Sequence, residues 1–297
     1  MKNVMPLFAA AFLLALGTPA AGQDDETEQL KIAALEALIS APPERALPLA
    51  EKALKGDHSD EIKERALFVL SQIDRPEATE LMLGVAVDGE GELREEAIRM
   101  IGIGGNDDAL ARLKTIYADG DEEIRGAVLE AYLIAGDSQS VFDIAVAAET
   151  EDEFGDAVEM LAAMGARDEL RQLREQRGMS ESLIEAYIIS GDAGPLREIA
   201  LDTSNPELQE SAIEALGVIG GAEVDALLVE IYSTAASDDI RDAALEGMLI
   251  SGYDEGVLSL YRASDDDAEK RRLLEYLVIM DSEAVWDLID SALDGTL

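Results

Sequence analysis

The sequence is poor in the side chains on which many enzyme and metal sites depend. Its 297 residues include no cysteine, one histidine (His58) and one tryptophan (Trp286). The absence of cysteine excludes disulfide bonds, thiolate catalysis, Cys-ligated zinc and iron–sulfur clusters. A single histidine excludes most multi-histidine metal sites. We therefore predict no catalytic residue, no metal site and no cofactor, and a protein that is not an enzyme.

Positive charge is also scarce. The chain has 23 Lys and Arg against 64 Asp and Glu, which gives a formal net charge of −41. Nucleic acid is not an expected partner, because neutralising phosphates requires clustered Lys and Arg. Hydrophobic residues make up 48% of the chain, an ordinary share for a folded protein, so the acidity does not indicate disorder.

The first 22 residues have the layout of a signal peptide. Lys2 precedes an apolar run from Met5 to Leu16, and the small residues Ala20 and Gly22 follow it. The run is too short for a transmembrane helix, although an uncleaved anchor is the alternative. No cysteine is present to carry a lipid anchor. We predict cleavage of residues 1–22 and a mature protein, residues 23–297, that is periplasmic or secreted and not attached to a membrane.

An eight-residue pattern recurs nine times in the mature chain. Its first residue is always aliphatic, its second is Glu in seven copies, and its eighth is Gly in six copies. Successive copies begin 26 to 32 residues apart. The first residues of the nine copies are Leu35, Leu67, Ile98, Leu129, Val158, Ile184, Ile213, Leu245 and Leu274.

Each copy is typical of the end of an amphipathic helix, because Gly after an apolar run is a common helix C-cap. A second amphipathic stretch follows each copy, and short acidic joints precede the next one, where negative charge favours a helix start. The sequence therefore predicts an all-α fold, a right-handed α-solenoid of about nine helix–turn–helix repeats. The 26-residue step after Val158 is too short for two full helices plus joints, so we expect irregularity there. Trp286, in the last second helix, is expected to cover the end of the core.

The repeat resembles the HEAT repeat, in particular its short bacterial form. The resemblance rests on an acid-x-aliphatic-basic-x-x-Ala start, seen at residues 61–66 and 92–97, and it covers residues 26 to about 293. It implies binding to other macromolecules. Deoxyhypusine hydroxylase has a similar architecture, but that family holds iron with repeated His-Glu pairs, which one histidine cannot supply. Bilin lyases of phycobiliproteins also use such repeats, and the export signal argues against both.

One stretch is locally basic and is the candidate partner-binding site. Spacings of four, three and three residues place its arginines on one face of a helix. This face could receive an acidic partner segment, or it could pair locally with Glu169, Glu175 and residues 149–153. The four arginines are Arg167, Arg171, Arg174 and Arg177.

The sequence is best interpreted as an exported protein-binding or scaffold module. We expect the second helices of successive repeats to line a concave groove that receives a protein or peptide with a basic patch. Two alternatives remain open: a HEAT-like enzyme or enzyme-accessory protein of the lyase type, and a purely structural, salt-adapted envelope protein. His58, in a joint between repeats, is interpreted as a turn residue.

Overall fold

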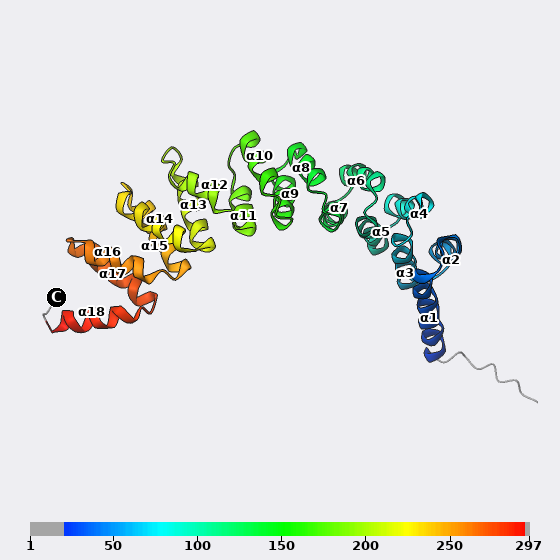
Figure 1. Cartoon of the computed structure of the whole chain (residues 1–297), viewed down its shortest axis with the longest axis horizontal. Coiled ribbons are helices and arrows are strands. Elements are labelled where there is room, and N and C mark those ends of the chain that lie inside the picture. The colour runs from blue at the N-terminus through cyan, green and yellow to red at the C-terminus, as the bar shows by residue number, and fades with distance from the viewer. Residues whose placement is uncertain (1–20, 295–297) are drawn as a thin grey trace, which may run out of the picture. The chain divides into compact units, whose positions relative to one another are not determined.

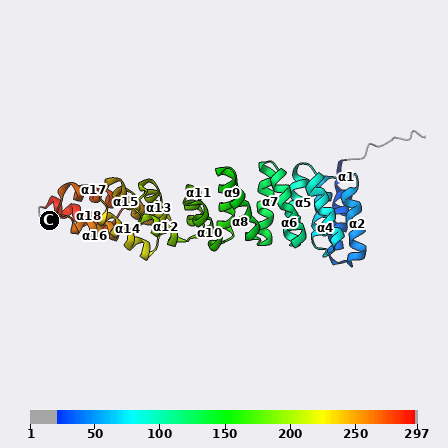
Figure 2. The same ribbon diagram turned by 90° about the horizontal axis from the view of Figure 1, so that it is seen from above.

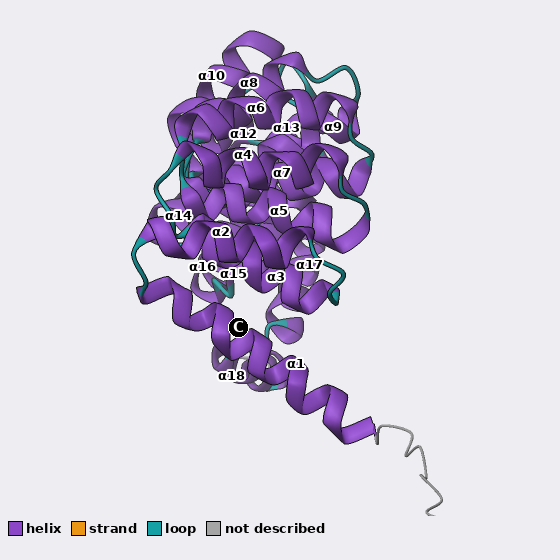
Figure 3. Ribbon diagram, turned by 90° about the vertical axis from the view of Figure 1, so that its right-hand side faces the viewer, coloured by secondary structure: helices purple, strands orange, loops and turns teal. Residues whose placement is uncertain are grey.

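The computed structural model describes residues 21–294, apart from the side chains of residues 21–25 and 292. The predicted signal peptide, residues 1–22, therefore lies almost wholly outside the described residues. Within the described part there are eighteen α-helices, one 3₁₀ helix and no strand (Figure 3). The all-α prediction is confirmed. None of these helices is both long and apolar enough to cross a membrane.

The chain divides into two compact units between Asn106 and Asp107. The first unit contains α1 (Ala21–Glu36), η1 (Ala37–Ser40), α2 (Pro43–Lys55), α3 (Asp60–Ser71), α4 (Pro76–Asp88) and α5 (Gly91–Gly104). The second unit begins with α6 (Asp107–Asp119), α7 (Glu122–Ala135), α8 (Ser138–Ala147), α9 (Glu151–Ala163), α10 (Arg167–Arg177), α11 (Glu181–Ser190) and α12 (Ala193–Ala200). It continues with α13 (Pro206–Ile219), α14 (Ala222–Thr234), α15 (Asp238–Ser251), α16 (Asp254–Ala263), α17 (Asp267–Ile279) and α18 (Glu283–Leu293). A single domain over residues 23–297 stays a prediction.

The second unit is built from the predicted pairs of first and second helices. The odd-numbered helices from α7 onward carry the recurring pattern and are the first helices of their repeats. Neighbouring first helices from α7 to α15 contact one another in turn, and the second helices lie in a separate layer (Figures 1 and 2). Anchors such as Val158, Ile213 and Leu245 are fully buried between the two layers. The pairing buries the apolar stripe of each amphipathic helix against its neighbours.

The predicted glycine caps are present. All six glycines at the eighth position have positive φ, from 60° to 73°. At Gly136 the backbone N–H bonds to the carbonyls of Leu133 and Tyr132, which closes the end of α7. A residue with a β-carbon is strained in this left-handed conformation, so glycine fixes where each of these helices ends.

The acidic joints act as helix starts, as expected. The Asp121 carboxylate accepts a hydrogen bond from the Ile124 N–H at 3.1 Å, at the start of α7. The Asp266 carboxylate accepts bonds from the N–H groups of Ala268 and Glu269 at 2.8 and 2.9 Å, at the start of α17. Part of the acidity therefore serves the helix N-termini, where N–H groups lack intrahelical partners.

The short step after Val158 shortens one helix. Both α10 and α11 are present, as helices of 11 and 10 residues. However, α11 begins only three residues before its anchor Ile184, whereas α9 begins seven residues before Val158. The prediction that two full helices plus joints would not fit is confirmed, because α11 lacks one turn at its start.

The expectation for Trp286 is also wrong. Its side chain on α18 is 53% exposed, whereas the preceding residue, Val285, is fully buried. The register of α18 therefore directs the smaller valine into the core and leaves the indole largely in solvent.

Candidate functional site

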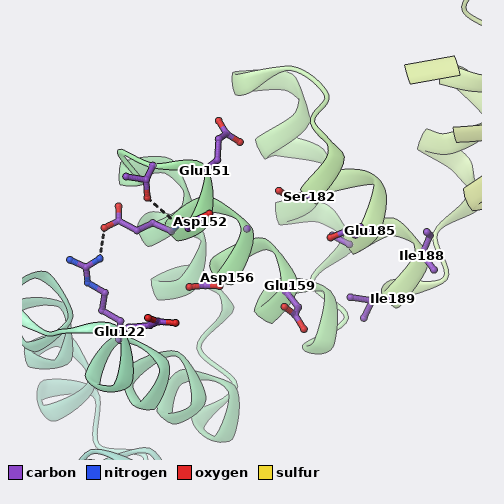
Figure 4. Close-up of a pocket in the computed structure, with 14 residues that line it drawn as sticks. Glu122, Glu151, Asp152, Asp156, Glu159, Ser182, Glu185, Ile188 and Ile189 are labelled. Atoms are coloured by element: carbon purple, nitrogen blue, oxygen red, sulfur yellow. Dashed lines mark hydrogen bonds and ion pairs between the residues drawn. The ribbon is translucent and has the colours of Figure 1, made fainter. Parts of the chain in front are cut away.

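A hollow of the second unit lies on its first helices. Residues of α7, α9 and α11 enclose about 920 Å³ of open space (Figure 4). The hollow lies beside the shortened start of α11. Ser182, in the first turn of α11, and Gly155 of α9 line the hollow.

The hollow is strongly acidic. Seven carboxylates line it, against the single guanidinium of Arg125, which pairs with Glu153. Burial raises the pKa of the Asp156 carboxyl above its ordinary value, and the charges of Glu159, Glu122 and other neighbouring acids raise it further. The seven acids are Glu122, Glu151, Asp152, Glu153, Asp156, Glu159 and Glu185. Because like charges gather here without enough cations, a positively charged ligand would relieve their repulsion.

One wall of the hollow is apolar. Ile188 and Ile189, in the last turn of α11, line it beside Glu185 (Figure 4). The Ile189 side chain is 52% exposed. The hollow therefore combines a carboxylate surface with an aliphatic surface that no part of the described chain covers fully.

This position differs from the predicted one. We expected the second helices to line the binding groove, but this hollow is formed by first helices. The Glu that follows each aliphatic anchor from Leu129 onward marks the solvent-facing side of a first helix. It is the sequence signal that could have located this hollow. The 26-residue step between Val158 and Ile184 is the sequence signal that could have located the shortened start of α11.

The four predicted arginines lie on α10 and do not line this hollow, and all four have partners within the chain. Arg167 donates to the Ser190 carbonyl at 2.7 Å, and Arg174 pairs with Glu198 at 2.7 Å. Arg171 donates to the buried Asp192 carboxylate at 2.7 Å. These contacts join α10 to the end of α11 and to α12, rather than to Glu169, Glu175 or residues 149–153.

Arg177 holds the other side of α10. Its guanidinium donates to the carbonyls of Ala145 and Ala148 at 2.9 and 3.3 Å and lies 4.4 Å from the centre of the Phe154 ring. Such contacts stabilise the ends of α8 and α9 against α10. Binding of a partner by Arg167, Arg171, Arg174 and Arg177 stays a prediction, and it would have to displace these intramolecular bonds.

No group of three or more His, Cys, Asp or Glu in the described part of the chain is placed to hold a metal ion. His58 lies in the joint before α3, next to the N-cap residue Ser59. Its interpretation as a helix-start or turn residue stays a prediction; its Nδ1 atom is buried and has no hydrogen-bond partner.

The raised pKa values predict how stability depends on pH. Burial, together with Glu246 and Glu210, also raises the pKa of Glu214. A carboxyl whose pKa is raised by folding binds its proton more tightly in the folded state, so its ionisation disfavours folding. We expect the free energy of unfolding to fall as pH rises from about 4, near the ordinary carboxyl pKa, through the raised values. Denaturant titrations at several pH values measure this slope.

The variant Asp156→Asn tests the cause of that slope. It should make the slope shallower and raise stability at neutral pH by less than about 0.5 kcal/mol, since the group is largely exposed. An unchanged slope would contradict the contribution of Asp156 to it.

The comparisons with known proteins agree with the repeat. The profile of the family described as HEAT repeats matches residues 47–133. This segment consists of HEAT repeats. No curated protein sequence matches it significantly.

Three solved structures are among those similar to this chain. An engineered protein is 14% identical over 91% of each chain, with a TM-score of 0.34. The CpcE–CpcF complex of phycocyanin lyase from a Nostoc species is 17% identical over 81% of this chain and 95% of that one, with a TM-score of 0.35. Human deoxyhypusine hydroxylase is 19% identical over 91% of this chain and 93% of that one, with a TM-score of 0.34. At these TM-scores the likeness says nothing about function.

Proposed function

We propose that this chain binds another protein, and that a basic segment of the partner occupies the hollow on the first helices of the second unit. The observation that carries the proposal is the hollow itself, in which seven carboxylates and an aliphatic wall face open space. Lysine and arginine side chains suit such a surface, because their charged ends meet carboxylates while their apolar stems cover aliphatic groups.

The charge of the whole chain supports the same partner. A protein with a net charge of −41 attracts cationic segments at long range, which raises the rate of encounter and weakens with added salt. It repels nucleic acid and anionic membranes for the same reason. The partner is therefore a protein or peptide with a basic patch.

We further propose that the protein is exported and acts in the periplasm or outside the cell. The positive Lys2, the short apolar run from Met5 to Leu16 and the small residues before Gln23 support this location.

Filling the hollow should weaken binding of a basic peptide. Gly155 lies on α9, and a β-carbon there would be 3.5 Å from the Ser182 hydroxyl, so a longer side chain must extend into the open space. We expect Gly155→Leu to reduce affinity about tenfold, or about 1.4 kcal/mol. The measurement is fluorescence anisotropy of a labelled peptide of alternating Lys and Gly, titrated with the full chain.

Gly155→Ala is the matched control. Like Gly155→Leu, it replaces glycine by a residue that favours a helix, but it adds only one methyl group. It should change affinity less than about twofold. Leucine and alanine both favour a helix more than glycine, so neither variant should unfold the protein. Equal binding by the wild-type chain and Gly155→Leu would place the binding site elsewhere.

Two further measurements separate this proposal from its alternatives. A purely structural, salt-adapted protein would bind no basic peptide at moderate salt, and added salt would raise its free energy of unfolding. An enzyme-accessory protein of the lyase type would lose a measurable activity when the acids of the hollow are replaced by their amides.

A further inference from the structure

A row of exposed aliphatic side chains lies on five of the six first helices of the second unit, and on α9 the same position is Ala163. In the recurring eight-residue pattern these residues stand at the sixth position, two residues before the helix cap. Their exposed fractions run from 42% to 65%. We call this set the aliphatic row, and its members are Ile134, Ile189, Val218, Ile250 and Ile279.

A second row runs parallel to it. The glutamates at the second position of the pattern precede the aliphatic positions by four residues, so both stand on the same face of each helix, about 6 Å apart along its axis. We call this set the glutamate row, and its members are Glu130, Glu159, Glu185, Glu214, Glu246 and Glu275.

Two members of the glutamate row interact across neighbouring helices. Burial raises the pKa of Glu214 on α13, and the charge of Glu246 on α15 raises it further. The charge of Glu246 also reaches α17, where burial and Glu246 raise the pKa of Tyr276 and Arg272 lowers it. Carboxylates on neighbouring helices are therefore close enough to repel each other at the α13–α15 contact.

The surface is continuous because its helices are in contact. First helices α11, α13 and α15 pack against each other in turn, and Arg272 of α17 pairs with Asp242 of α15. At its α11 end the surface opens into the acidic hollow, since Glu185 and Ile189 belong to both.

We propose that this surface binds an amphipathic α-helix of a partner protein, whose apolar stripe covers the aliphatic row and whose Lys and Arg side chains face the glutamate row. The proposal rests on the proposed function and specifies the form of the basic segment. The occupant is basic because the row beside the aliphatic side chains is acidic, and it is amphipathic because the two rows are parallel.

Two physical arguments favour a helical occupant over an extended one. The backbone groups of the first helices are bonded within those helices, so the surface offers side chains only and cannot satisfy the N–H and C=O groups of a strand. A helix satisfies its own. In addition, packed helices lie about 8–10 Å apart, and seven residues of an α-helix span about 10.5 Å. One heptad of the partner thus corresponds to one repeat of this surface.

The test compares two labelled peptides of identical composition in anisotropy titrations with the full chain. The first has about three heptads, with leucines on one stripe, lysines beside them and alanines elsewhere. The second carries the same residues in an order without helical period. We expect the amphipathic peptide to bind at least about tenfold more tightly, a difference of about 1.4 kcal/mol.

Substitutions in the aliphatic row provide the matched comparison. Ile189→Gln with Ile250→Gln should weaken the amphipathic peptide about tenfold and the scrambled peptide little. Val146→Gln with Leu201→Gln, at exposed aliphatic positions of α8 and just after α12, should weaken neither. Equal affinity for the two peptides would overturn the helical occupant and leave the proposed function standing. Binding of neither peptide would overturn both.

Discussion

Gly217→Ala should lower the free energy of unfolding by about 2–3 kcal/mol, in the upper range for overpacking a core. Gly217 of α13 faces Gly247 of α15, and a β-carbon at Gly217 would lie only 2.5 Å from the Gly247 Cα. The obstacle is backbone rather than a flexible side chain, so the two helices must move apart and lose contacts along their length. Denaturant unfolding of the full chain measures the change.

Gly126→Ala is the control for this prediction. Gly126 lies inside α7, and a β-carbon there would meet nothing within 4 Å. The same substitution should therefore stabilise the protein by about 0.5–1 kcal/mol, because alanine favours a helix over glycine. If both variants shift stability in the same direction, the close approach of α13 and α15 is not a determinant of the fold.

Reversing two charges of the glutamate row should reduce the affinity for the amphipathic basic peptide about a hundredfold. In Glu159→Lys with Glu185→Lys, lysines replace carboxylates that line the hollow. Like charges then meet across the interface, which typically costs several kcal/mol in a specific complex. The loss should appear in anisotropy titrations at low salt and shrink as salt is added.

Glu175→Lys with Glu230→Lys is the matched control. These exposed acids lie on the second helices α10 and α14, and their reversal changes the net charge by the same amount. We expect less than about a threefold loss, from weaker long-range attraction alone. Equal losses in the two double variants would show that overall charge, and not the first-helix surface, determines binding.

Much of the fold could be predicted because local chemistry determines it. The glycines at the eighth position mark helix ends, since only glycine adopts their backbone conformation without strain. The aliphatic anchors and the acids ahead of each first helix likewise specify buried positions and helix starts. Each of these determinants acts within one helix or one joint. It therefore recurs at the same position in each repeat and can be recognised in the sequence.

The binding surface was harder to predict because it depends on contacts between repeats. The step after Val158 indicated an irregularity, but not that α11 would lack a turn at its start or that a hollow would lie beside it. The arginines of α10 showed the expected spacing. Their partners, such as Asp192 and the Ala145 carbonyl, belong to neighbouring helices and are not evident from spacing.

Site-specific photo-crosslinking of the amphipathic basic peptide tests the central claim most directly, that the first helices of the second unit form the binding surface. A photoreactive side chain is placed at Ile189 on α11 or at Val146 on α8, which are exposed to 52% and 44%. The account predicts a crosslinked product from position 189, lost in excess unlabelled peptide, and little product from position 146. Equal crosslinking at the two positions, or crosslinking at position 146 alone, would contradict it.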